Sequence, residues 1–323
     1  MDGSMTDVPA ATLPDQRFLR GCALVVLAGV VLSLGVFCIR NTSGADAWVY
    51  LFWRALGFTT ALVTIAAWRG TENLPRQLAR LRGFAWMAAL GMTMSQITFI
   101  SSVKIATFAE VFLICSLVPL VAAALAWPVL GERLNVWTGV AIALGLAGVA
   151  FMTSDSVASG GAVGGSQFGL LLAVAAMLSF ATYTLSTRGS SPRDLDATLI
   201  AVGLLTTVAS AVAVHLLGLS LIASTRDALI AFVHGGVLLA AGLFLFGQGS
   251  RSVDAVTFTM LAQAEAVMAP LWGYWYFRET PTVGTMIGGA IILAAITLQA
   301  ATAARPAKPA PASSPPPATR KPA

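Results

Sequence analysis

The sequence has few charged side chains for its length. Of 323 residues, 19 are Lys or Arg and 14 are Asp or Glu, so charged residues make up 10% of the chain, whereas soluble domains carry about 25%. Apolar residues make up 57% of the chain, and the mean hydropathy is +0.81. These charges are too few to cover a water-soluble surface, which excludes a large soluble catalytic domain and a nucleic-acid-binding protein.

Cysteine and histidine are also scarce. The three cysteines (Cys22, Cys38 and Cys115) are odd in number and lie in apolar runs, which excludes a disulfide scaffold and favours a packing role. The two histidines, His215 and His234, are isolated from each other and no metal-ligand spacing occurs, so we expect neither a metal site nor a cofactor. The chain has no P-loop motif, and we therefore expect no direct use of ATP.

Long apolar runs dominate the remainder of the sequence. Their backbones must form their own hydrogen bonds in hydrocarbon, and the runs show no alternation of period two, so we expect an all-α integral membrane protein with ten transmembrane helices. The expected spans are residues 19–39, 47–68, 84–103, 107–130, 136–153, 168–187, 197–218, 228–248, 255–277 and 282–302.

Basic residues are distributed unequally between the two sets of loops. With the N-terminus inside the cell, 14 Lys and Arg residues lie in cytoplasmic segments, and four lie outside: Arg40, Lys104, Arg226 and Arg278. Cytoplasmic loops carry the excess of positive charge, so we expect both termini in the cytoplasm. No small-residue cleavage site follows the first span, and a cleaved signal peptide is not expected.

The chain aligns with itself at an offset of 147 residues. The aligned pairs include Lys104 with Arg251, Glu132 with Glu279 and Thr138 with Thr285. Each half contains five expected spans, and because five is odd the second half enters the membrane from the opposite side. This is the inverted repeat from which many secondary transporters build a site at the bilayer midplane.

The repeat predicts the division of the chain. We expect a cytoplasmic N-terminal tail (1–18), a first five-helix repeat (19–153), a flexible Gly-rich linker (154–167), a second five-helix repeat (168–303) and a disordered Pro/Ala-rich tail (304–323).

Short motifs recur in both halves. The first half contains Pro119, then Gly131-Glu132-Arg133-Leu134, and then Gly139, Gly145 and Gly148. The second half contains Glu265-Ala266, Arg278-Glu279 and Gly288-Gly289, and the second span contains Trp53-Arg54. Over residues 19–302 this pattern resembles the EamA repeat of the drug/metabolite transporter superfamily. The resemblance implies the ten-helix fold and a small substrate, such as an amino acid or its derivative, S-adenosylmethionine, a nucleotide sugar or riboflavin.

Ionisable side chains inside a span are costly in lipid, so each needs a partner, a water-filled cavity or a role. Glu265 is about ten residues into the ninth span, or about 15 Å along the helix axis, near the midplane. We interpret Glu265 as a proton carrier or a contact for a substrate cation, with a structural ion pair to Arg54 as the alternative. Arg54 keeps its proton, and it either binds a substrate carboxylate or phosphate or serves as a snorkelling or helix-pairing residue.

Other titratable groups are expected nearer the outer face. Glu110 is one turn into the fourth span and His234 is about a turn and a half into the eighth. Both are candidates for titration from the outer side, and the alternative for both is an ordinary interfacial side chain. We expect Lys104, Arg251, Glu132 and Glu279 to be anchors at span ends.

Polar and aromatic side chains within the spans are candidates for lining a substrate cavity. They are Trp53, Gln96, Ser116, Gln263 and Trp272, and core packing is the alternative for the two tryptophans. Pro119 and Pro270 each lack a backbone donor and are expected to kink spans four and nine at matching depth.

Spans five and ten have few ionisable residues and many glycines. Gly284 and Gly288 form a face of small residues, and Gly139 with Ala143 forms a weaker one. We expect these two helices to pack against neighbours or another protomer and not to line the transport path.

Together these features predict a secondary transporter of the inner membrane, which moves a small polar or amphipathic metabolite by alternating access. The expected partners are a small-molecule substrate, the lipid bilayer and, as coupling ion, protons; no nucleic acid and no enzymatic activity are expected. The alternatives are a channel or a structural membrane partner, followed by an embedded membrane enzyme. The sequence leaves open the substrate, the direction of transport, the coupling ion or exchange mode, and the oligomeric state.

Overall fold

The computed structural model describes residues 16–42, 44–70, 74–131, 135–158, 167–190, 194–222, 224–253 and 255–303, and these residues form helices without strands. The helices are α1 (Gln16–Ser33), α2 (Gly35–Arg40), α3 (Ala47–Trp68), α4 (Leu74–Arg80), α5 (Phe84–Ile105), α6 (Phe108–Cys115), α7 (Val118–Leu130), α8 (Val136–Ala158), α9 (Gln167–Gly189), α10 (Leu195–Leu216), α11 (Thr225–Val233), the π-helix η2 (His234–Leu239), α12 (Ala240–Gly249), α13 (Ala255–Ala262), α14 (Ala264–Phe277) and α15 (Val283–Ala303).

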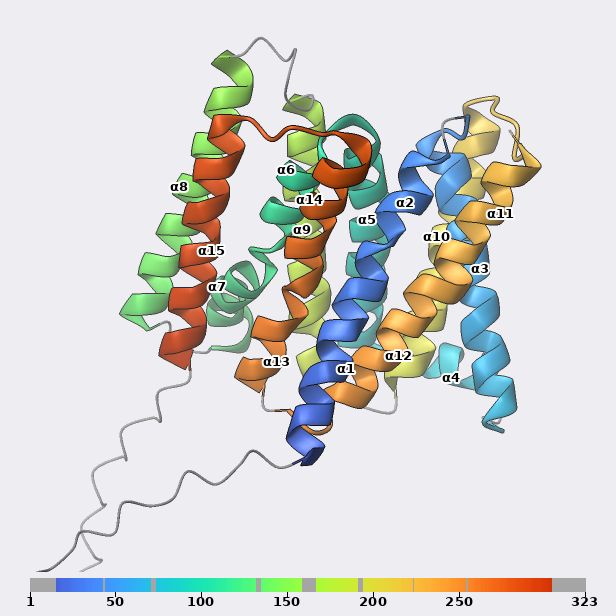
Figure 1. The fold of residues 1–323 in the computed structure, drawn as a ribbon. Coiled ribbons are helices and arrows are strands. Elements are labelled where there is room, and N and C mark those ends of the chain that lie inside the picture. The colour runs from blue at the N-terminus through green and yellow to red at the C-terminus, as the bar shows by residue number, and fades with distance from the viewer. Residues whose placement is uncertain are drawn as a thin grey trace, which may run out of the picture.

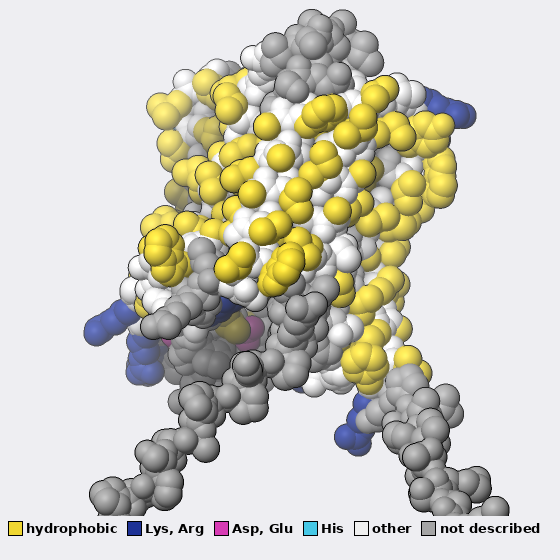
Figure 2. Space-filling model, turned by 90° about the vertical axis from the view of Figure 1, so that its left-hand side faces the viewer, with side chains coloured by type: hydrophobic (Ala, Val, Ile, Leu, Met, Phe, Trp, Pro, Cys, Tyr) yellow, Lys and Arg dark blue, Asp and Glu magenta, His cyan; other side chains and the backbone are white. Residues whose placement is uncertain are grey.

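The length and composition of the helices fit a bilayer. Eight helical segments among the described residues are long and apolar enough to cross a membrane, and Val136–Met152 is a shorter apolar helix. Figure 2 shows hydrophobic side chains over most of the height of the side that α8 covers, with Lys and Arg mainly toward the lower end. The prediction of an all-α, multi-pass membrane protein is confirmed.

Several expected features lie outside the described residues. They are most of the Gly-rich linker, the Pro/Ala-rich tail, most of the N-terminal tail, and the first-half motif residues Glu132 and Arg133. The described chain nevertheless starts and stops at one end of the bundle. In Figure 1 the beginning of α1, the end of α15 and the short helix α4 all lie at the lower end.

The first helix of each half of the chain packs against helices of the other half. Helix α1 packs against α12, α13 and α14, whereas α9 packs against α5, α6 and α7. We call α1, α2, α12, α13 and α14 the α1 group. We call α5, α6, α7 and α9 the α9 group. Helix α3 packs against α10, and α8 packs against α15 at the side of the bundle (Figure 1).

Glycines allow the closest helix approaches. A Cβ added to Gly288 of α15 would lie 2.6 Å from the carbonyl oxygen of Gly148 in α8, so the two backbones approach closely, beside the Met152 side chain. A Cβ added to Gly235 of η2 would lie 1.8 Å from the carbonyl oxygen of Arg54 in α3. The first contact involves the expected small-residue face of the tenth span, whereas a Cβ on Gly139 would meet no atom within 4 Å.

Two of the helical rods are broken partway along their length. Helix α6 ends at Cys115 and α7 begins at Val118, with Pro119 in its first turn, where a missing N–H leaves no hydrogen bond unmade. Helix α13 ends at Ala262 and α14 begins at Ala264, while Pro270 lies inside α14 without ending it. The break in the second rod therefore falls at Gln263 and not at the proline.

Candidate functional site

Arg54 of α3 lies inside the bundle. Its side chain is 7% exposed, and its Nη1 donates a hydrogen bond to Oε1 of Gln96 on α5. The Nε of the same guanidinium is buried and has no hydrogen-bond partner in the part of the chain that the structure describes. A buried donor without a partner is costly, so this edge of Arg54 is a natural place for a ligand acceptor or a water molecule.

Glu265 supplies the opposite charge. It is in the first turn of α14, directly after the break at Gln263, and its side chain is half-buried. The charges of Arg54 and Glu265 lie close enough to interact electrostatically, but no salt bridge within 4.0 Å joins these two described side chains. The N-terminus of α14 carries partial positive charge and favours the carboxylate.

The two helix breaks meet in the interior. Nε2 of Gln263 donates to the carbonyl oxygen of Ser116 at 3.4 Å, and the two residues are 147 positions apart. This separation equals the offset of the internal repeat, so equivalent breaks in the two halves contact each other. Cys115, the last residue of α6, lies close enough to Glu265 for an electrostatic interaction.

A buried aromatic pair adjoins Arg54. The Tyr50 hydroxyl, on the same face of α3 one turn earlier, forms a hydrogen bond with Nδ1 of His234, the first residue of η2. Tyr50 is 0% and His234 is 6% exposed, and a Cβ on Gly35 would lie 2.6 Å from the His234 ring. Tyr50 was not predicted as a site residue from the sequence; its spacing of four residues from Arg54 was the available signal.

The indole N–H groups of Trp53 and Trp272 form hydrogen bonds away from Arg54 and Glu265. Nε1 of Trp53 donates to the carbonyl oxygen of Leu221 at 2.7 Å, and the ring lines an apolar groove of about 310 Å³. Nε1 of Trp272 donates to Oγ of Ser33 at 3.0 Å, and its ring packs 5.6 Å from that of Phe37. Neither indole N–H contacts Arg54 or Glu265.

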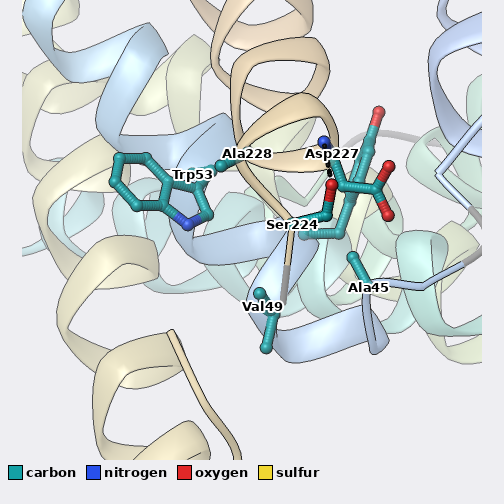
Figure 3. A pocket seen from close by; sticks show the side chains of 7 residues that line it. Ala45, Val49, Trp53, Ser224, Asp227 and Ala228 are labelled. Carbon is teal, nitrogen blue, oxygen red and sulfur yellow. Dashed lines mark hydrogen bonds between the residues drawn. The ribbon is translucent and has the colours of Figure 1, made fainter. Parts of the chain in front are cut away.

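A small pocket beside Trp53 contains a second acidic residue. Figure 3 shows Trp53 and Asp227 on opposite sides of it, with the hydrogen bond from the Asp227 N–H to Ser224 Oγ. Oδ2 of Asp227 accepts from the Gly44 N–H at 3.1 Å. Asp227 thus joins the loop before α3 to the start of α11.

Glu110 caps α6. Its Oε2 accepts from the N–H of Thr107 at 3.2 Å and from Oγ1 of Thr107 at 2.8 Å, and the Glu110 N–H donates back to Thr107 Oγ1. This reciprocal pair is a capping box, and Glu110 is 0% exposed. Nearby, Nζ of Lys104 donates to the carbonyl oxygens of Thr42 and Ala45, which ties the end of α5 to the loop before α3.

The interior combines polar and charged side chains without a metal ligand set among the described residues. Among the described residues, no three His, Cys, Asp or Glu side chains are grouped so as to hold a metal ion. Arg54, Gln96, Glu265, Gln263 and the Ser116 carbonyl instead offer donors, acceptors and both charges around two helix breaks.

The fold, together with the following comparisons with known proteins, defines a multi-pass membrane protein of a transporter class. A family model described as the EamA-like transporter family matches the chain twice, at residues 19–154 and 167–300. The chain belongs to this family, within the drug/metabolite transporter superfamily, and the resemblance noted in its sequence is confirmed.

Two relatives carry the same general description. An uncharacterized transporter of Archaeoglobus fulgidus is 28% identical over 282 residues, which cover 86% of this chain and 95% of the relative. The uncharacterized transporter YwfM of Bacillus subtilis is 29% identical over 223 residues, or 67% of this chain and 74% of the relative.

A solved structure supports the fold alone. A crystal structure of a protein aligns with a TM-score of 0.61 at 18% identity, covering 90% of this chain and 99% of the other. The overall helix arrangement is thus similar to that of a solved structure.

Proposed function

We propose that this protein is a secondary transporter that moves a small polar or amphipathic metabolite, such as a zwitterionic amino-acid-like molecule, by alternating access. The observation that carries the proposal is the buried guanidinium of Arg54, which has an unpaired Nε and lies near the carboxylate of Glu265 at a helix break. A zwitterion has one group for each charge, and Arg binds carboxylates through two parallel hydrogen bonds.

The proposed topology has ten spans in two inverted repeats, 19–153 and 168–303, with both termini in the cytoplasm. The α8 helix and the α13–α14 rod account for the two spans beyond the eight long apolar segments. The exchange of α1 and α9 between the halves supports the inverted relation. Reporter fusions after Gly70 should behave as cytoplasmic and fusions within 154–167 as periplasmic; a cytoplasmic linker would contradict this topology.

Glu265 is the proposed coupling group. A carboxylate inside the bilayer is costly when ionised, so it takes up or releases a proton as the cavity changes its access to water. Glu265→Gln resembles the protonated form and preserves shape. It should abolish accumulation driven by a pH gradient, while exchange of substrate across the membrane continues.

The experiment uses proteoliposomes with radiolabelled α-amino acids and amines as probes, with and without an imposed pH gradient. Acceleration of uptake by unlabelled substrate on the far side identifies a carrier and distinguishes it from a channel. If Glu265→Gln accumulates substrate as the parent does, proton coupling through Glu265 is wrong and Glu265 is a structural partner of Arg54.

A further inference from the structure

Three helix ends meet at the upper end of the bundle in Figure 1, opposite α4. Arg40 is the last residue of α2, Glu279 follows α14 by two positions, and Phe108 is the first residue of α6. Nη2 of Arg40 lies 2.6 Å from Oε1 of Glu279, and the two side chains form a salt bridge. The two side chains are 30% and 19% exposed, so both are only partly buried.

The same two side chains also bind the start of α6. The Phe108 N–H, which has no acceptor within its own helix, donates to Oε2 of Glu279 at 3.1 Å. Nη2 of Arg40 donates to the carbonyl oxygen of Ala106 at 3.4 Å, and the guanidinium lies 4.8 Å from the centre of the Phe108 ring. The Phe108 ring is in turn 6.2 Å from that of Phe277.

The ion pair lies within one helix group, whereas the contacts with Ala106 and Phe108 join the two groups. The ion pair between Arg40 and Glu279 lies within the α1 group, because α2 and α14 both belong to it. The contacts with Ala106 and Phe108 cross to the α9 group, whose helix α6 begins there. Any motion that separates the two groups at this end must break the crossing contacts, whereas the ion pair itself can stay intact.

We propose that Arg40 and Glu279, together with Ala106 and Phe108, form a latch that closes the outer end of the transport path. In the latch the ion pair holds both charged side chains in position, and the contacts across the groups keep the path shut. The latch rests on the proposed alternating access and on the proposed orientation. It assigns to Arg40 and Glu279 a gating role beyond anchoring the ends of two helices.

Cys115 provides a built-in reporter of the latch. It is at the inner end of α6, seven residues beyond Phe108 and thus about 10 Å deeper along the helix axis. Replacing Cys22 and Cys38 by serine leaves Cys115 as the single thiol. A membrane-impermeant maleimide, added to intact cells or to inside-out vesicles, then reports the side from which the interior is reached.

Opening the latch should speed labelling from outside. Glu279→Ala removes the acceptor of the Phe108 N–H and the partner of Arg40, and the labelling rate from outside should rise about tenfold, as loss of a charge-assisted hydrogen bond shifts an equilibrium. Glu279→Gln keeps an oxygen for Phe108 and should give a smaller rise. Arg278→Gln, which removes an exposed charge one residue away, is the matched control and should label like the parent.

The exchanged pair Arg40→Glu with Glu279→Arg gives the sharpest test. This double variant can restore the ion pair, but Glu at position 40 cannot donate to Ala106 and Arg at position 279 cannot accept from Phe108. Labelling should therefore stay fast. A return to the parent rate would show that the contacts with Ala106 and Phe108 are not needed to keep the path shut, and it would overturn the latch.

The remaining outcomes are also decisive. Equal labelling of parent, Glu279→Ala and Glu279→Gln, with comparable protein in the membrane fraction, would overturn the latch. Faster labelling only from inside-out vesicles would keep the coupling between the latch and access but overturn its outer location and, with it, the proposed topology. Failure of proton-driven uptake in Glu265→Gln bears on coupling and leaves the labelling result unaffected.

Discussion

Arg54 shows how a single buried charge limits what the interior can bind. Gln96 satisfies one nitrogen of the guanidinium, and Nε has no partner among the described residues. A Lys at this position keeps the charge but loses the planar fork that binds a carboxylate at two points. Comparing Arg with Lys at position 54 therefore tests whether the ligand has a carboxylate, and not only whether the site needs a positive charge.

Arg54→Lys should reduce transport of substrates with a carboxylate by about tenfold or more and reduce transport of amines without a carboxylate much less. Initial rates in proteoliposomes over a range of concentrations measure the effect. Arg69→Lys, at the exposed end of the same helix, is the control and should transport normally. Equal losses for both substrate kinds would place Arg54 in a structural role.

Arg278 holds an unusual backbone conformation. It ends α14 with φ of 57°, and Gly131, the equivalent residue 147 positions earlier, ends α7 with φ of 69°. A side chain in this left-handed region costs about 1–2 kcal/mol, whereas glycine adopts it freely. The second repeat thus carries a strain that the first avoids.

Arg278→Gly should raise the free energy of unfolding by up to about 1 kcal/mol after the entropy of glycine is deducted. The reverse change, Gly131→Ala, should lower it by about 1 kcal/mol. The apparent Tm of the purified protein in detergent measures both. A lower Tm for Arg278→Gly would show that contacts of the Arg278 side chain outweigh the backbone strain.

At the scale of helices, α3 approaches the end of α11 and the start of η2 very closely. A Cβ on Gly235 would overlap the Arg54 carbonyl oxygen, and a Cβ on Gly57 would lie 2.2 Å from the carbonyl oxygen of Phe232. The contact positions Tyr50 and His234 for their hydrogen bond. Single π-turns of this kind are frequent at functional sites.

Gly235→Ala should destabilise the protein by about 3 kcal/mol, because neither backbone can move without disturbing its own helix. The yield of monodisperse protein and its Tm in detergent should both fall. Gly247→Ala in α12 is the matched control, since its Cβ would meet no atom within 4 Å. A normal Tm for Gly235→Ala would mean that η2 and α3 can separate at little cost.

Sequence predicts some of these elements and not others. Apolar run length predicted the helices: residues 84–103 correspond to α5 (Phe84–Ile105), because lipid demands helix wherever the run is long enough. Pro119, where a kink was expected, lies just after the break between α6 and α7, whereas the break at Gln263 has no local signal and α14 continues through Pro270. Tertiary packing decides such a break.

The candidate site was predicted in part for a similar reason. The cost of charge in lipid selects Arg54 and Glu265 from sequence alone. The bond between Tyr50 and His234 spans 184 positions, and the latch contact between Phe108 and Glu279 spans 171. A single sequence does not specify which distant residues meet, so these contacts required the structure.

At the scale of the whole molecule, the exchange of α1 and α9 makes the two halves interdependent. Helix α1 buries its surface mainly against α12, α13 and α14, so the first half alone leaves these faces unpaired. Hydrophobic contact is weak as a driving force between helices in lipid, but close packing and polar contacts remain effective. The halves should therefore stay together without a covalent link.

Cleavage at a protease site inserted within 159–166 should leave the halves associated. The two fragments should elute as one species in size-exclusion chromatography in mild detergent and separate only on a denaturing gel. The uncut protein with the same insertion is the control. Separation of the fragments in mild detergent would show that the exchanged helices contribute little to cohesion.

Because α1 packs against helices from the second half, it is synthesised well before most of its packing partners. Apart from α2, its partners in the α1 group begin with α12, about 200 residues after α1 ends. At a ribosome rate of 5–20 residues per second, about 10–40 s pass between the emergence of α1 and that of α12. During that interval α1 rests in the lipid or beside the insertion machinery, so a chain interrupted before α12 leaves α1 without its final neighbours and open to quality-control proteases.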